Sequence, residues 1–200
     1  VIMYFDGIIK YLGDVDETLL SPINQILKEY NESDWDNPAF IRRDYNLTYS
    51  RLIEFPWFVS NKHEPYNDRD LSILTLCEPL INMIRERYYP KYIRVRGEIA
   101  TILPGTQISY HMDENNFHKL SHRIHVPLLT NNENFNIWKV NDEDVEIHLE
   151  YGKIYEINNR IIHSAINRSN VHRTHLIIDL CTIKSFSQIL NTGVKLDLEN

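Results

Sequence analysis

The spacing of apolar residues changes midway along the chain from a helical period to a strand period. Over residues 16–31, and again over 70–88, leucine and isoleucine recur at intervals of three and four, which predicts two amphipathic helices. Pro79 falls inside the second segment and predicts a kink or break there. Apolar and β-branched residues over 2–11 and 48–58 predict two strands in the same half of the chain.

The second half of the chain consists of short β-rich segments. They span residues 92–103, 106–113, 122–130, 134–140, 144–150, 153–157, 161–168 and 172–183. Turn residues separate the segments, as at Pro104-Gly105 and Tyr151-Gly152. Many short strands between regular turns are typical of an all-β sandwich or barrel.

Together these patterns predict a mainly β fold with flanking helices. We expect one domain over residues 1–200. Residues 1–90 would buttress one sheet, residues 91–183 would form the β core, and 184–200 would form a short helix or tail.

Composition narrows the class of protein. The net charge of -7 argues against a nucleic-acid or membrane-surface partner, since either would require a basic face. No apolar run reaches the roughly 20 residues of a membrane span, and the first residues do not resemble a secretory signal. Cys77 and Cys181 lie in apolar stretches and are expected to be free, buried thiols. We therefore expect a cytoplasmic protein.

A histidine followed two residues later by a carboxylate occurs at His111/Asp113 and at His148/Glu150. About one such match is expected by chance, so the pattern alone is weak. Strand alternation places His148 in a charged row that is most simply a solvated face. By the same alternation His111 and Asp113 project together, opposite the apolar face that contains Ile108. Both could therefore reach one metal ion.

A third ligand is available at His163, in the next-to-last β segment. Two imidazoles and one carboxylate on one face of an octahedral ion leave three positions open, as in non-heme Fe(II) oxygenases. Zinc could use the same residues with a water molecule for hydrolysis. The three residues alone leave both metals open.

The arginines favour iron. Arg173 lies ten residues after His163 and shares a strand face with His175 and Ile177. A guanidinium on an inward face needs an anionic partner, and a carboxylate binds it with two hydrogen bonds. This suits a dicarboxylate held between the metal and Arg173, which a hydrolytic zinc site does not require. The alternative is a structural ion pair of Arg173, for example with Asp179 or Glu156.

Two further candidates, Arg123 and His125, share one face of the segment 122–130 and would surround the presumed metal. Packing of this arginine and histidine in the core is the alternative. His118 and His122 lie in or beside a polar insertion, ENNFHKLS, and are expected to be solvated.

The order of these motifs resembles that of a known family. HMD, RIHVPLLTN, YGKIYEINN, HSAIN and RTHLIIDL, over residues 92–183, are similar to the aspartyl/asparaginyl β-hydroxylase-like family of 2-oxoglutarate- and Fe(II)-dependent oxygenases, which includes bacterial proline hydroxylases. The resemblance implies a double-stranded β-helix, or jelly roll. It implies iron on His111, Asp113 and His163, and Arg173 on the distal carboxylate of 2-oxoglutarate. It places Arg123 and His125 near the other end of this co-substrate.

The activity implied is hydroxylation of an unactivated C–H bond of an amino acid, free or in a peptide, by Fe(II), 2-oxoglutarate and O2, with release of succinate and CO2. The animal hydroxylases lack the carboxylate that Asp113 provides, so the chain looks nearer the bacterial enzymes that act on free amino acids. The ENNFHKLS loop would cover the substrate. A non-catalytic jelly roll that binds a small acid, and a zinc hydrolase, are the alternatives. The sequence does not predict an oligomeric state.

Overall fold

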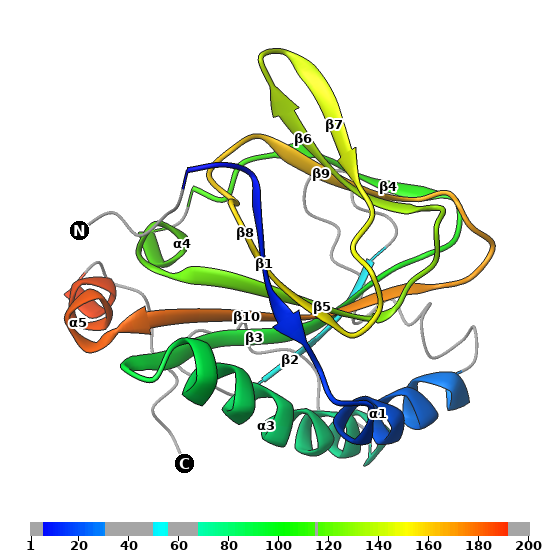
Figure 1. The fold of residues 1–200 in the computed structure, drawn as a ribbon, viewed down its shortest axis with the longest axis horizontal. Coiled ribbons are helices and arrows are strands. Elements are labelled where there is room, and N and C mark those ends of the chain that lie inside the picture. The colour runs from blue at the N-terminus through cyan, green and yellow to red at the C-terminus, as the bar shows by residue number, and fades with distance from the viewer. Residues whose placement is uncertain (1–5, 31–49, 56–67, 115, 192–200) are drawn as a thin grey trace.

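Two antiparallel β-sheets face each other, and two long helices cover the outer side of the larger sheet (Figure 1). This computed structural model describes residues 6–30, 50–55, 68–114 and 116–191. The major sheet has six strands in the order β1 (Ile9–Asp14), β8 (Lys153–Ile157), β5 (His122–Leu129), β10 (Arg173–Thr182), β3 (Tyr92–Ile102) and β2 (Ser50–Glu54). The minor sheet has the order β4 (Thr106–His111), β9 (His163–Asn167), β6 (Asn134–Val140) and β7 (Glu143–Ile147).

The strands from β3 to β10 form a jelly roll. Along this part of the chain, β3, β5, β8 and β10 enter the major sheet, while β4, β6, β7 and β9 enter the minor one. The predicted β core is confirmed, and two predicted segments, 134–140 and 153–157, coincide with β6 and β8. The first strand, predicted over 2–11, lies later in the chain, at Ile9–Asp14, and residues 2–5 of the predicted segment lie outside the described residues.

Helix α1 (Glu17–Glu29) begins where the side chain of Asp16 accepts a hydrogen bond of 2.8 Å from the backbone N–H of Thr18. Its buried side chains, Leu20, Ile23 and Leu27, recur at helical spacing. The short helices α4 (Asn116–Leu120) and α5 (Ile183–Asn191) lie at one end of the sheets (Figure 1).

Helix α3 (Asp68–Tyr88) continues through Pro79, so the predicted break does not occur. Proline removes one backbone hydrogen bond from a helix. On both sides of it the helix is held by fully buried residues, among them Ile73, Cys77, Leu80 and Ile84, and this packing outweighs the lost hydrogen bond. Cys77 and Cys181 are free and buried, as expected.

The main apolar core lies between the helices and the outer face of the major sheet. Alternate residues of β5 and β10, such as Ile124, Val126, Leu176 and Ile178, pack there against α1 and α3. The predicted buttress of one sheet by N-terminal helices is therefore confirmed. The opposite, inner face of the same strands carries histidine, arginine and aspartate instead. Within the described ranges, no helix combines the length and apolar character that crossing a membrane requires.

Candidate metal centre

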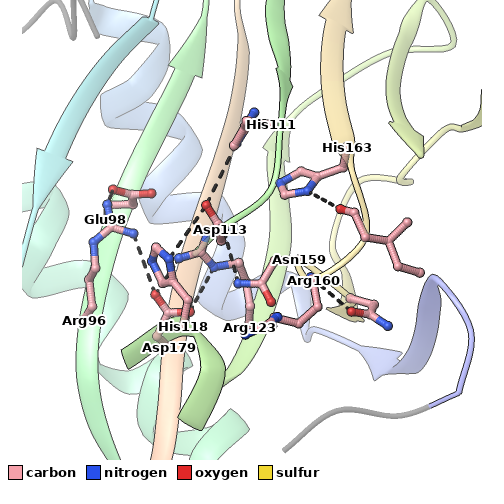
Figure 2. Close-up of polar contacts among 12 residues, drawn as sticks. Arg96, Glu98, His111, Asp113, His118, Arg123, Asn159, Arg160, His163 and Asp179 are labelled. Atoms are coloured by element: carbon pink, nitrogen blue, oxygen red, sulfur yellow. Dashed lines mark hydrogen bonds and ion pairs between the residues drawn. The ribbon is translucent and has the colours of Figure 1, made fainter. Parts of the chain in front are cut away.

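The three candidate ligands meet where β4 and β9 lie side by side. His111 is the last residue of β4, Asp113 follows two residues later, and His163 is the first residue of β9. His111 and His163 are direct partners across the two strands. One ligand atom from each of the three residues lies within 4.8 Å of the others, and Figure 2 shows the three side chains converging.

A β-bulge in β4 aims His111 at this cluster. Ile108 pairs with Ala165 and His111 with His163, so Ser109 and Tyr110 together oppose one residue of β9. The extra residue turns Ile108 and His111 to the same face, and both line one cavity. The expected opposition between Ile108 and His111 is therefore wrong, because simple alternation does not hold across a bulge.

Backbone carbonyls fix which ring nitrogen of each histidine is available. Nδ1 of His111 lies 2.8 Å from the carbonyl oxygen of Ser109, and Nδ1 of His163 lies 2.8 Å from that of Ile161. Since a carbonyl only accepts, both Nδ1 atoms carry hydrogen and both Nε2 atoms keep a lone pair. Burial lowers the pKa of His163 to about 4, so this ring is neutral at pH 7. A neutral imidazole with a free Nε2 is the form that binds a metal ion.

Asp113 is held through one of its two oxygens. Its Oδ2 accepts hydrogen bonds from Nη1 of Arg123 and, at 3.0 Å, from Nδ2 of Asn159. Its Oδ1 lies 3.9 Å from Nε2 of His111. Burial alone would raise the pKa of this carboxyl, but the guanidinium of Arg123 outweighs burial and the pKa lies well below its usual range. Asp113 is therefore ionised at any pH at which the protein works.

Behind Asp113, buried charges alternate in sign (Figure 2). One edge of the Arg123 guanidinium donates to both oxygens of Asp179, through Nε at 2.9 Å and Nη2 at 2.8 Å. Asp179 also lies 3.7 Å from Nη1 of Arg96, and Arg96 pairs with Glu98. Because each charge has a neighbour of opposite sign, burial of the whole row is tolerated.

One cavity of about 510 Å³ contains all six predicted site residues. They are His111, Asp113, His163, Arg173, Arg123 and His125. Arg173 and Asp179 lie six residues apart on β10, which is about 20 Å along a strand. The structure therefore places Arg173 well away from the Arg123–Asp179 pair that holds Asp113.

Arg173 is a buried cation. Its side chain, 5% exposed, donates to Oδ1 of Asn136 and lies 3.3 Å from Nδ1 of His175. Burial lowers the pKa of Arg173 to about 9, which still leaves it charged at neutral pH. Among the described residues no carboxylate contacts it. The alternative ion pairs are not formed, because Asp179 binds Arg123 and Glu156 binds His122.

The predicted neighbours of the metal differ in what they contact. Arg123 is engaged by two carboxylates, as described above, so part of its work is to hold Asp113. Nδ1 of His125 lies 3.4 Å from Nδ1 of His175, which is also buried. Nε2 of His125 has no hydrogen-bond partner among the described residues.

Two histidines expected to be solvated are not. His118 lies on α4, is 7% exposed, and brings Nδ1 within 3.7 Å of Oδ1 of Asp113 (Figure 2). His122 packs against the rings of Tyr89 and Tyr92. For His118 the expectation failed because the ENNFHKLS segment, treated as a loop, folds partly as a helix on which this side chain is buried. His122 is instead the first residue of β5. His148 lies away from the site, with Nδ1 bound to the carbonyl oxygen of Asn134.

Sequence analysis also missed residues that support the ligands. Asp179 shares the odd-numbered face of β10 with Arg173, so strand alternation could have identified it as a site residue. Asn159 lies between β8 and β9, and strand alternation does not indicate its contact with Asp113. Arg96 and Glu98 lie on β3. Strand alternation predicts that the two side chains share a face, but it does not predict which residues they contact.

The comparisons with known proteins agree with this geometry. Similar folds occur in AviO1 from Streptomyces viridochromogenes Tue57, with 11% identity, a TM-score of 0.57 and coverage of 88% of this chain and 90% of that chain. A prolyl-4-hydroxylase of Pseudomonas putida has 11% identity and a TM-score of 0.56, covering 88% and 94% of the two chains. A Trichoplax adhaerens prolyl hydroxylase in complex with a hypoxia inducible factor peptide fragment has 11% identity and a TM-score of 0.55, covering 90% and 86%.

The family itself is shown by sequence. A search of curated proteins finds no match to the chain. The model of the family described as Aspartyl/Asparaginyl beta-hydroxylase matches residues 74–182, more than half of the chain. This range contains β3 to β10 and every predicted site residue. The chain therefore belongs to the aspartyl/asparaginyl beta-hydroxylase family of 2-oxoglutarate- and Fe(II)-dependent oxygenases.

Proposed function

We propose that this protein is a dioxygenase that uses Fe(II), O2 and 2-oxoglutarate to hydroxylate an amino acid, free or within a peptide. One observation carries the proposal. The cavity that contains a two-histidine, one-carboxylate cluster also contains Arg173, a buried guanidinium that contacts no carboxylate among the described residues. A small dicarboxylate supplies the missing anion and can extend toward the metal cluster.

The donor set fits Fe(II). Nε2 of His111, Nε2 of His163 and Oδ1 of Asp113 would hold the ion, leaving three of six positions open. When bound, iron together with O2 and 2-oxoglutarate supplies the oxidising power needed to hydroxylate an unactivated C–H bond. The chain contributes ligand orientation, through the carbonyl contacts of both histidines and the hydrogen bonds to Asp113.

Arg173 would bind the distal carboxylate of 2-oxoglutarate with two parallel hydrogen bonds. Arg123 and His125 line the same cavity. In this proposal both contact the keto-acid end of 2-oxoglutarate. Because the cavity walls bury these groups, water competes poorly for them, and the charge-assisted hydrogen bonds are stronger than at an exposed surface.

The proposal of an amino-acid substrate rests on the similarity of the fold to known hydroxylases and on the residues that line the cavity. Two solved structures that share the fold are prolyl hydroxylases, and one of them is in complex with a peptide fragment. Here Arg96, Glu98 and Glu114 add charge of both signs to the cavity, which suits a substrate with an amino or carboxyl group. Succinate and CO2 are the expected co-products.

The test is succinate formation by the purified protein with Fe(II), 2-oxoglutarate and pools of amino acids and short peptides in air. We expect turnover that depends on Fe(II) and O2, that His163→Ala abolishes, and that His148→Ala retains. His148 is the matched control because it also precedes a carboxylate by two residues but lies outside the site. Failure of the wild-type protein to bind 2-oxoglutarate or to form succinate contradicts the proposal. Hydrolysis supported by zinc without O2 would favour the hydrolase instead.

A further inference from the structure

We propose that Asn159 is a positioning residue that restricts Asp113 to metal binding through a single oxygen. This inference rests on the proposed function, because it concerns the metal held by His111, Asp113 and His163. It assigns a role to the turn between β8 and β9, which contributes no ligand of its own.

Asn159 and Asp113 are joined by a reciprocal pair of hydrogen bonds. The backbone N–H of Asp113 donates to the carbonyl oxygen of Asn159 at 3.1 Å, and Nδ2 of Asn159 donates to Oδ2 of Asp113 at 3.0 Å. The side chain of Asn159 is nearly fully buried, with 4% exposure. Figure 2 shows its amide directed at the carboxylate. The pair fixes both the backbone and the side chain of a residue that lies just beyond the end of β4.

The contacts make the two carboxylate oxygens inequivalent. Oδ2 receives two donors, Nδ2 of Asn159 and Nη1 of Arg123, which use its two lone-pair directions. Oδ1 instead lies 3.9 Å from Nε2 of His111 and 3.7 Å from Nδ1 of His118, and both distances are longer than a hydrogen bond. A metal ion beside the two histidines therefore finds one available oxygen. Binding through one oxygen leaves three positions of an octahedral ion open, whereas binding through both would leave two.

The turn that carries Asn159 is itself fixed. The neighbouring Asn158 accepts the indole N–H of Trp138 on its carbonyl oxygen at 3.3 Å and the backbone N–H of Arg160 on Oδ1 at 3.1 Å. Its Nδ2 donates to the carbonyl oxygen of Gly7 at 2.9 Å. Asn159 can therefore hold Asp113 in place, since the adjacent Asn158 ties this turn to Trp138 on β6 and to Gly7 before β1.

This role of residue 159 requires a side-chain amide. The side chain of Asn159 must donate to a carboxylate, and an aspartate there would place acceptor against acceptor. Alanine removes the donor, and serine replaces the amide with a shorter hydroxyl group, while both keep the backbone contact to the N–H of Asp113. Asn132, exposed in the turn before β6, offers a matched asparagine outside the site.

The experiment measures Mn(II) binding to the protein without 2-oxoglutarate, by titration under anaerobic conditions, for the wild type and for Asn159→Ala, Asn159→Ser and Asn132→Ala. We expect Asn159→Ala and Asn159→Ser to weaken the affinity by about 10- to 100-fold, and Asn132→Ala to leave it unchanged. Crystal structures of the Mn(II) complexes should show Asp113 bound through Oδ1 alone in the wild type, and through both oxygens or rotated in the variants. Serine provides the second variant should alanine fold poorly.

Each result decides between the two proposals. Affinity within twofold of the wild type in both Asn159 variants, with Asp113 still bound through one oxygen, overturns the role of Asn159. In that case, succinate formation by these variants would leave the proposed function intact. A wild-type protein that binds neither Mn(II) nor Fe(II) overturns both.

Discussion

Arg173 keeps a positive charge inside the protein, where it contacts the amide of Asn136 and the ring of His175. A buried charge without a counter-charge is costly, and a folded chain tolerates it where binding of an anion recovers the cost. Arg168, five residues earlier in the chain, shows the contrast. It is exposed and already paired with Glu146, so it has no such requirement.

Replacing Arg173 tests the co-substrate end of the cavity. We expect Arg173→Gln to raise the dissociation constant for 2-oxoglutarate by about 30-fold or more, because a buried, hydrogen-bonded charge pair is worth 2 kcal/mol or above. Arg173→Lys should recover part of the loss, since an ammonium group makes a single point contact. Mn(II) affinity should be unchanged in both variants. Calorimetry of 2-oxoglutarate binding to the Mn(II) protein measures this, with Arg168→Gln as the control. Equal affinity in Arg173→Gln and the wild type would exclude Arg173 as the anchor.

The buried histidines give the metal-free protein a defined acid sensitivity. Burial lowers the pKa of His125 and of His175 well below the ordinary value, so both stay neutral in the folded state. In the unfolded chain they take up protons below about pH 6.5. Acidification from pH 7.5 to 5 therefore favours unfolding, by up to about 1.4 kcal/mol per pH unit for each histidine.

The variant His175→Gln removes one of these protons. Urea unfolding of the protein in a metal chelator, measured between pH 5 and 7.5, should show stability that falls less steeply with acidification in the variant than in the wild type. Parallel pH profiles for the two proteins would contradict the neutral, buried state of His175.

At the scale of residues, the sequence predicts site residues best where a polar side chain lies on a strand, because alternation then indicates the face to which it points. His111, His163 and Arg173 were predicted as site residues in this way, and the three side chains line one cavity. Asn159 and His118 could not be found, because each reaches the site from a turn or a short helix. Strand alternation has nothing to say about such positions.

Among the elements, β4 shows that a sequence pattern can predict the extent of a strand correctly and the facing of its side chains wrongly. The predicted segment 106–113 contains β4 completely. The bulge opposite Ser164 then reverses the faces of the residues that precede it, so that Ile108 joins His111 in the cavity. Register of this kind depends on pairing with β9, which is distant in sequence, and a single strand does not encode it.

The turns between strands were better defined by local sequence. Gly105 and Gly152, both in predicted turns, adopt positive φ values of 67° and 68°, a region that favours glycine. A Cβ at Gly152 would lie 2.8 Å from Cδ1 of Leu20, whereas a Cβ at Gly105 would meet nothing within 4 Å. The turn before β8 thus also serves as a contact surface for α1.

These two glycines form a matched pair for a stability test. Gly105→Ala should cost about 1–2 kcal/mol of unfolding free energy from backbone strain alone. Gly152→Ala should cost more, because Leu20 is in the core and must shift to accept the methyl group. Urea unfolding of both variants checks the order. A Gly152→Ala variant no less stable than Gly105→Ala would mean that α1 adjusts freely at this point.

On the scale of the whole molecule, the cavity is the place where the two sheets are tied together by polar groups. The candidate ligands come from the minor sheet and the segment after it, while Arg123, Asp179 and Arg173 come from the major sheet. A bound metal ion and a bound dicarboxylate would therefore each add contacts that the unfolded chain lacks. The overall layers were predictable from the change of period along the chain, but this sharing of one site between sheets was not.

Ligand binding should accordingly stabilise the fold in steps. We expect Mn(II) at about 100 times its dissociation constant to add about 2.7 kcal/mol to the unfolding free energy. 2-Oxoglutarate should add a further increment once the metal is present. Thermal unfolding measures both, with His163→Ala expected to lose the metal effect and Arg173→Gln the co-substrate effect. Stabilisation by Mn(II) that persists in His163→Ala would place the metal elsewhere.

The position of β10 has a consequence for synthesis of the chain. This strand is the last to appear in the sequence, yet it lies in the middle of the major sheet, between β5 and β3. β1, the first strand, likewise pairs with β8, which is synthesised much later. A nascent chain that ends before Arg173 lacks the strand that joins the halves of the sheet, so the major sheet cannot close on the ribosome until residue 182 has emerged. Until then β3 and β5 lack the strand with which both pair in the folded protein.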